Sequence, residues 1–193
     1  MKRLSVFCGS SVGKRREYYA AAQAMGIALA ESGIGLVFGG GRVGLMGAIA
    51  DACLNAGGDV IGVIPRALAT KELAHDGLKD LRVVESMHDR KALMAELCDG
   101  FVALPGGFGT LEEFFEVLTW AQLGIHRKPC GLLNTAGFFD PLLDLIEHSV
   151  DEGFVSAEHR RLMVHATEPR VLLEKVTSFT APEIKRWVTS ERS

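Results

Sequence analysis

Apolar and polar residues along the chain form two alternating kinds of segment. Short runs rich in Val, Ile, Leu and Phe are separated by longer segments whose apolar residues recur every three or four positions. The short runs predict buried strands and the longer segments predict helices. Strands are expected at residues 4–8, 35–38, 60–64, 81–84, 101–104, 130–133 and 162–164. Helices are expected at residues 15–32, 45–56, 89–98, 111–123, 141–152 and 169–176.

Regular alternation of strand and helix is typical of a parallel sheet covered by helices on both of its faces. We therefore expect an α/β fold with a doubly wound, mostly parallel seven-stranded sheet, Rossmann-like and formed as a single domain. Residues 1–178 would make up this domain, and the weakly patterned residues 179–193 would form a C-terminal tail. In such a sheet, ligands bind beyond the carboxyl ends of the strands, near the point where the strand order reverses.

Composition narrows the kind of partner that the chain can bind. The 193 residues are 48% hydrophobic and 23% charged, which is enough apolar material for a single core. The net charge of -3 gives no general attraction to nucleic acid or to an anionic membrane, so we expect neither as a partner. The apolar stretch at the N-terminus is too short for a signal peptide or a membrane span. These features favour a small-molecule partner.

Four widely spaced cysteines, none in a C-x-x-C pair, predict buried reduced thiols rather than disulfides or a zinc site. A cytoplasmic location follows from that expectation. No histidine or cysteine spacing suggests a metal site, so neither a metal nor another cofactor is expected.

The most informative segment runs from Pro105 to Glu113, where a short strand passes into a helix through a glycine turn. Glycines allow a ligand to approach the backbone closely, and a helix N-terminus carries about half a positive charge. An anion such as a phosphate fits this position. Glu113 is open to two interpretations. It could complete a capping box with Thr110, or it could perform chemistry beside the bound phosphate.

A second glycine loop matches G-x-G-x-x-G at Gly39, Gly41 and Gly44, which raises the possibility of a dinucleotide oxidoreductase. That fingerprint expects an acid at the end of the following strand. Asp59 instead lies at the start of that strand, so a tight turn facing a ligand is favoured. The Walker motif of phosphate-binding P-loops is absent from the sequence.

Charged residues elsewhere add a weaker signal. Arg90 and Lys91 begin a predicted helix, where the macrodipole disfavours cations, so an anionic partner is expected: either Glu113 or a substrate phosphate. His88 is interpreted as structural. Glu72 belongs to a polar stretch, residues 70–80, that is expected to form a mobile loop at the mouth of the crevice. The helix over residues 114–123 is apolar on more than one face, including at Trp120, which favours a two-fold dimer.

Three segments together closely resemble the LONELY GUY (LOG) family: residues 39–47, residues 87–91 and the P-G-G-x-G-T-x-x-E signature that ends on Glu113. Members of this family, often labelled lysine decarboxylases, are cytokinin riboside 5′-monophosphate phosphoribohydrolases, and they are dimers. The resemblance implies Arg90 and Glu113 as the catalytic pair. It also implies that the substrate nucleotide is surrounded by Glu72, Lys91, Gly106, Gly107, Phe108, Gly109, Thr110, Leu111 and Glu112. We add Ser10, Gly40, Gly41, Gly44 and Met46, from the loops expected at the same crevice.

Two classes of function stay open at this point. The first is hydrolysis of the N-glycosidic bond of adenosine 5′-monophosphate or an N6-substituted form of it, with a general AMP nucleosidase as a variant. The second is a non-catalytic nucleotide or cofactor carrier, since glycine loops alone would hold a phosphate without turnover. An acid paired with an arginine close to the phosphate favours the enzyme, because a simple carrier has little use for it.

Overall fold

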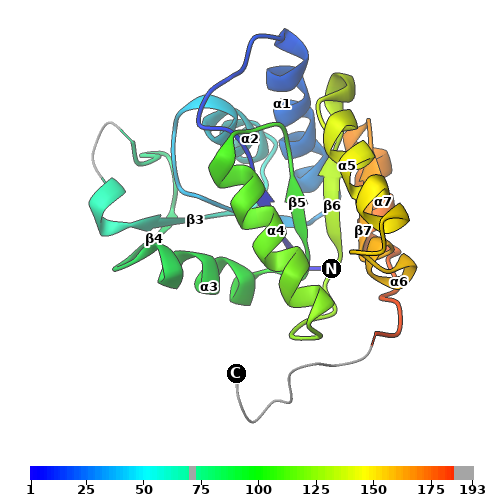
Figure 1. The fold of residues 1–193 in the computed structure, drawn as a ribbon. Coiled ribbons are helices and arrows are strands. Elements are labelled where there is room, and N and C mark those ends of the chain that lie inside the picture. Colours follow the sequence, from blue (N-terminus) through cyan, green and yellow to red (C-terminus); the bar gives the residue numbers. More distant parts are fainter. Residues whose placement is uncertain (70–72, 185–193) are drawn as a thin grey trace.

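The computed structural model describes residues 1–69 and 73–184, in which strands and helices alternate (Figure 1). The strands are β1 (Arg3–Phe7), β2 (Gly35–Phe38), β3 (Val60–Pro65), β4 (Asp80–Val84), β5 (Phe101–Ala103), β6 (Cys130–Leu133) and β7 (Met163–Ala166). The α-helices are α1 (Arg16–Glu31), α2 (Gly44–Asn55), α3 (Met87–Leu97), α4 (Phe108–Gln122), α5 (Asp140–Asp151), α6 (Ala157–Arg160) and α7 (Pro169–Thr177). Short 3-10 helices are η1 (Arg66–Leu68) and η2 (Thr135–Gly137).

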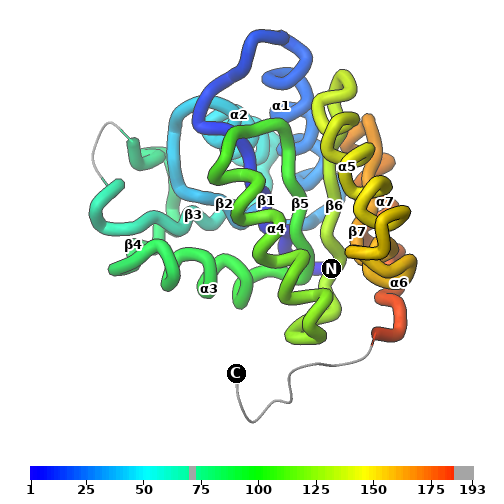
Figure 2. Tube along the Cα trace, viewed as in Figure 1, coloured from blue at the N-terminus to red at the C-terminus, as the bar shows by residue number. Residues whose placement is uncertain are grey.

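The described strands form one seven-stranded sheet in the order β4-β3-β2-β1-β5-β6-β7, and every neighbouring pair is parallel. From β1 the chain moves outward through β2, β3 and β4. It then returns to pair β5 with β1 and moves outward on the other side. The strand order therefore reverses between β1 and β5, and the loops that leave these strands diverge to open a crevice. Figure 2 shows the two loops at the same end of the sheet.

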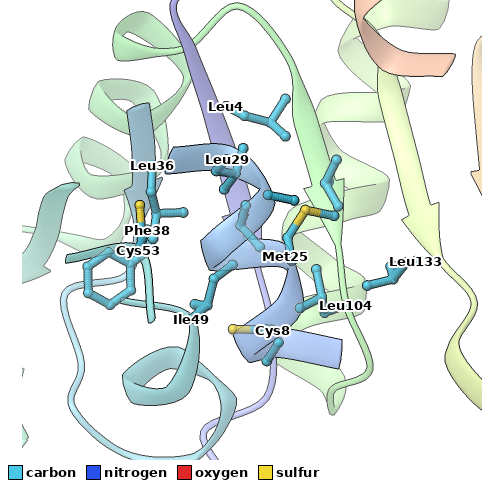
Figure 3. Close-up of a cluster of buried hydrophobic side chains, with 14 of the residues drawn as sticks. Leu4, Cys8, Met25, Leu29, Leu36, Phe38, Ile49, Cys53, Leu104 and Leu133 are labelled. Atoms are coloured by element: carbon cyan, nitrogen blue, oxygen red, sulfur yellow. The ribbon is translucent and has the colours of Figure 1, made fainter. Parts of the chain in front are cut away.

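Each face of the sheet is covered by helices, with a hydrophobic core on either side. The first core packs α1, α2 and α7 against one face, and Figure 3 shows part of it around Met25, Leu36 and Ile49. The second core packs α3, α4 and α5 against the other face. Helices α1 and α2 approach closely because Gly26 has no side chain. A Cβ atom at Gly26 would lie 2.4 Å from the carbonyl oxygen of Ile49.

The doubly wound fold and all of the expected strands are confirmed, with differences of a few residues at the ends of elements. The strand expected at residues 162–164 is Met163–Ala166, and the helix expected from residue 111 begins three residues earlier, at Phe108. Helix α6 was not expected. Of the stretch predicted as one loop, residues 70–80, residues 70–72 lie outside the described chain, and Asp80 begins β4. Within the tail, the described residues 179–184 form neither helix nor strand.

Candidate functional site

Three chain segments meet at the point where the strand order reverses. The amide of Gly9, just after β1, donates to the carbonyl oxygen of Pro105, just after β5, at 3.1 Å. The carbonyl oxygen of Gly9 in turn accepts from the amide of Leu45, in the first turn of α2, at 3.0 Å. Main-chain hydrogen bonds thus hold the loops after β1, β2 and β5 together. The predicted meeting of these segments at one crevice is confirmed.

This crevice contains a cavity of about 340 Å³. Its walls come from the segments that follow β1 and β5, from the first turns of α2 and α3, and from the first two turns of α4. The lining residues are Cys8, Gly9, Ser10, Met46, Met87, Arg90, Gly107, Phe108, Gly109, Thr110, Glu112 and Glu113. A second cavity, of about 250 Å³, shares Gly9, Ser10 and Gly107 with the first and continues toward Tyr18 and Phe138.

The N-terminus of α4 faces the first cavity, of about 340 Å³, and has no side-chain cap. The N-cap residue is Gly107, and no side chain accepts a hydrogen bond from the first-turn amides. Cβ atoms at Gly107 and Gly109 would meet no heavy atom within 4 Å, so both positions border open space. Uncapped amides and the positive end of a helix dipole are suited to binding an anion. The position is the one expected for a phosphate.

The capping-box interpretation of Glu113 is wrong, because α4 begins earlier than the sequence pattern indicated. Thr110 is the third residue of the helix rather than its cap, and it lies beneath the glycine turn. A Cβ atom at Gly106 would be 2.1 Å from the Thr110 hydroxyl oxygen. Glu113 lies almost a full turn further along α4, where its carboxylate pairs with the guanidinium of Arg90. Of the two anionic partners considered for Arg90, Glu113 is the one observed.

Arg90 is held in place from several sides. Helix α3 begins with a capping box in which Ser86 and Asp89 exchange hydrogen bonds, and Arg90 follows directly. The side chain is buried, with 8% exposed, and its Nε donates to the carbonyl oxygen of Val63 on β3 at 3.1 Å. A buried arginine with a main-chain acceptor and a carboxylate partner presents its guanidinium in one orientation.

Burial sets the electrostatics of the pair. Loss of solvent raises the pKa of Glu113 above its ordinary value, while the positive charge of Arg90 opposes this rise. Cys8 lies next to the pair, and burial together with the negative charge of Glu113 raises the pKa of its thiol. Cys8 therefore stays a neutral thiol and is no candidate nucleophile.

Lys91 forms a separate ion-pair cluster at the edge of the site. Its ammonium group contacts Glu112 at 2.6 Å and Glu116 at 3.0 Å, which links α3 to α4. The hydrogen bond with Glu112 raises the pKa of Lys91. Lys91 does not line the cavity, whereas Glu112 does. This cluster fixes the two helices that carry the pair.

The loop after β2 contributes less to the cavity than its glycines suggested. Of the predicted residues here, Met46 lines the cavity, and Gly40, Gly41 and Gly44 do not. Gly40 and Gly44 have positive φ angles of 72° and 62°, which favour glycine. A Cβ atom at Gly44 would be 2.2 Å from the carbonyl carbon of Ser10, so this glycine allows α2 to pack against the β1 loop.

The remaining predicted residues divide into three groups. Ser10 lines both cavities, and Gly106 lines the second. Leu111 is half-buried against the second hydrophobic core instead. Glu72 lies outside the described residues. Gly9 and Met87 belong to segments that the sequence places at the crevice, but they were not named as site residues, and Cys8 was missed altogether. Their positions at the end of a strand and at the start of a helix were the available signal.

Among residues 1–69 and 73–184 there is no group of three or more His, Cys, Asp and Glu side chains arranged to hold a metal ion. Among the helices of that same part of the chain, none combines the length and the apolar character that a membrane span requires.

Comparison with known proteins identifies close relatives. Residues 46–176 match a family model described as possible lysine decarboxylase. A cytokinin riboside 5′-monophosphate phosphoribohydrolase of Rhodococcoides fascians is 54% identical over 164 residues, covering 84% of this chain and 83% of the relative. The enzyme of the same name, LOG, from Oryza sativa subsp. japonica is 48% identical over 178 residues, covering 92% of this chain and 74% of the relative.

A solved structure shares the fold at much lower identity. The molybdenum cofactor binding protein of Rippkaea orientalis superposes with a TM-score of 0.69 at 21% identity, covering 92% of this chain and 96% of that one. This likeness confirms the Rossmann-type fold.

Proposed function

The chain belongs to the LOG family of cytokinin riboside 5′-monophosphate phosphoribohydrolases, and from this premise we propose that it hydrolyses the N-glycosidic bond of N6-substituted adenosine 5′-monophosphate. Water is consumed, and the products are the free base and ribose 5-phosphate. We assign the activity to residues 1–178. The observation that carries the proposal is the buried pair of Arg90 and Glu113 beside the uncapped N-terminus of α4.

The anion site fixes the substrate. The 5′-phosphate binds the first-turn amides of α4 at Gly107 and Gly109, where open space borders the backbone. The ribose then lies over the following turn of α4, within reach of Glu113. Binding energy from the phosphate positions the glycosidic bond against the carboxylate, so that a remote contact supports the chemical step.

Cleavage of the glycosidic bond develops positive charge on the ribose ring. The Glu113 carboxylate stabilises this charge and accepts a proton from the attacking water. Arg90 keeps that carboxylate ionised and oriented, and its remaining N–H groups donate to the base as it departs with the bonding electrons. The electron pair of the broken bond goes to the base, and the oxygen of water forms the new bond to the ribose. The proton that Glu113 accepts from water then passes through solvent to the departed base, which restores the carboxylate and gives the neutral free base.

The decarboxylase description of the matching family model finds no support at this cavity. A pyridoxal-dependent decarboxylase requires a lysine for the Schiff base. Among the described residues, no lysine lines the cavity, and Lys91 is engaged by Glu112 and Glu116.

One experiment separates the candidate functions. The purified protein is incubated with isopentenyl-AMP and, separately, with AMP, and the free base is measured by chromatography. Release of isopentenyladenine is the expected result. Release from AMP at an equal or higher rate identifies a general AMP nucleosidase. Binding of both nucleotides without release of either base would overturn the hydrolase and indicate a carrier.

We further propose that the protein is a homodimer that uses the outer surface of α4 and α5. One side of α4 packs into the second core, but Phe115 on its other side is 37% exposed. On α5 and the turn after it, Leu145 is 58% exposed and Phe154 is 85% exposed. Exposed apolar side chains on both helices, and on the turn after α5, are what a second copy would cover in the proposed dimer.

Sedimentation of Phe115→Glu tests this surface, because an exposed position tolerates the charge in a folded monomer. Val171→Glu, at a 42% exposed position on α7, is the matched control. The proposal predicts monomers for the first variant and dimers for the second. Dimers in both would remove this surface from the interface.

The four cysteines are free and buried, which supports a cytoplasmic location, where thiols stay reduced.

A further inference from the structure

Gly39, the first residue after β2, lies against the guanidinium of Arg90. A Cβ atom built on Gly39 would lie 2.1 Å from Nη2 of Arg90 and 3.3 Å from its Cζ. Real Cβ atoms do not approach other atoms so closely. The next nearest atom is the sulfur of Met46, at 3.2 Å, which belongs to a flexible side chain. The missing side chain of Gly39 is therefore the space that the guanidinium occupies.

The backbone conformation of Gly39 does not explain why glycine stands here. The glycines with positive φ in the described chain include Gly40 and Gly44 but not Gly39. An alanine could adopt the Gly39 backbone conformation without strain. The requirement at this position comes from the neighbouring arginine.

The loop that carries Gly39 has little freedom to move aside. The carbonyl oxygen of Gly40 accepts from the amide of His75 at 2.9 Å, and the amide of Arg42 donates to the carbonyl oxygen of Leu73, also at 2.9 Å. His75 is itself buried, and its ring contacts Asp51 at 3.0 Å and accepts from the amide of Gly77 at 3.2 Å. An added methyl group would therefore displace the guanidinium rather than the loop.

We propose that Gly39 is a positioning residue for the reaction: its lack of a side chain sets where the Arg90 guanidinium lies between Val63 and Glu113. This inference rests on the proposed function, since Arg90 matters only if the pair takes part in turnover. Gly39 itself touches no reacting atom and acts through Arg90.

The first test compares Gly39→Ala with Gly35→Ala, a matched substitution at the start of β2, the strand that leads into Gly39. A methyl group at Gly35 would meet the side chains of Arg3 and Asp59, far from the cavity. Gly39→Ala is expected to lower kcat by about 10²-fold, the scale of a small misplacement of a catalytic group, with KM close to that of the parent. Gly35→Ala keeps the parent kcat. Equal kcat in both variants overturns the inference.

The pH profile gives a readout that a loss of folding would not change. Glu113 faces Arg90 and Lys91 from α3, Cys8 from the loop after β1 and Glu112 from its own helix. Displacing Arg90 removes the charge that lowers the pKa of Glu113. The acid limb of kcat against pH therefore moves to higher pH in Gly39→Ala and stays unchanged in Gly35→Ala. An unmoved limb in Gly39→Ala counts against the inference.

A double-mutant cycle separates this inference from the proposed function. Arg90→Ala removes the atoms that the new methyl group would meet. The fall in Tm caused by Gly39→Ala should therefore shrink in the Arg90→Ala background, and this comparison needs no activity. An equal fall in both backgrounds overturns the inference. An Arg90→Ala protein with parental turnover would instead overturn the role of Arg90 in the proposed function, whatever the cycle shows.

Discussion

The two glycine loops of this protein have similar sequences and opposite uses. The loop after β2, Gly39 to Gly44, is filled by the protein itself: Arg90 occupies the space beside Gly39, and the Ser10 backbone packs against Gly44. The loop after β5 leaves Gly107 and Gly109 bordering open space at the start of α4. Glycine in the first loop allows close packing, whereas glycine in the second allows a ligand to approach.

This difference is the reason for proposing the second loop, and not the first with its better-known motif, as the ligand site. G-x-G-x-x-G describes spacing alone, and the structure shows that these glycines face other parts of the chain. The side chains of Arg90 and Glu113 connect the two loops, since Arg90 lies against the first and Glu113 is on the helix that follows the second.

Glu113→Gln tests that connection and has the largest expected effect. Gln keeps the size of the side chain but removes the charge that stabilises the ribose cation, so kcat should fall by about 10³-fold. Calorimetric titration with ribose 5-phosphate should still show binding, because the anion site is unchanged. Parental kcat in this variant would show that the pair only links two helices.

Removal of the substrate phosphate tests the loop after β5. If Gly107 and Gly109 bind the phosphate, adenosine and its N6-isopentenyl form should have a kcat/KM about 10²-fold below that of the monophosphates. The loss should include kcat, because the phosphate positions the glycosidic bond. Measured rates for each nucleoside beside its monophosphate decide the question. Comparable values would place the phosphate elsewhere.

The layers of this fold were predictable, because a chain of alternating short apolar runs and amphipathic segments has few other ways to bury its apolar residues. The residue at which α4 begins was not predictable. The sequence offered Thr110 as a cap with Glu113 three residues later, and this local pattern competed with a helix that begins at an exposed Phe108. A glycine N-cap carries no side-chain signal that a pattern could detect.

Long-range contacts also escaped the sequence. The basic residues at the start of α3 correctly indicated an anionic partner, but only the fold shows that Arg90 reaches Glu113 while Lys91 reaches Glu112 and Glu116. The role of Gly39 depends on Arg90, 51 positions further along the chain, because a Cβ atom at Gly39 would meet the Arg90 guanidinium. Motif spacing within one segment carries no information about such a contact.

Gly44→Ala tests the packing role of the loop after β2. The added Cβ would lie 2.2 Å from the carbonyl carbon of Ser10, and the φ of 62° is strained for alanine. We expect the free energy of unfolding to fall by about 2 kcal/mol, as for other strained backbone positions. Urea denaturation measures it. An unchanged midpoint would mean that this glycine, too, is open to substitution and that the contrast between the loops is overstated.

Gly109→Ala is the counterpart at the start of α4, directly after the loop that follows β5. Its effects should be smaller, and it should stabilise the protein where Gly44→Ala destabilises it. The new methyl group meets no atom within 4 Å, and the residue lies in the first turn of α4, so unfolding should cost about 0.5–1 kcal/mol more. The same methyl group occupies space beside the phosphate and should raise the KM for AMP roughly fivefold, equivalent to about 1 kcal/mol of binding. The KM for adenosine is the internal control, because a substrate without a phosphate does not use this site.

A parallel rise in both KM values would show a general distortion of the cavity, whereas a rise confined to AMP would locate the phosphate at this turn. A more stable protein with weaker phosphate binding would establish that Gly109 serves the ligand, while Gly44 serves the fold.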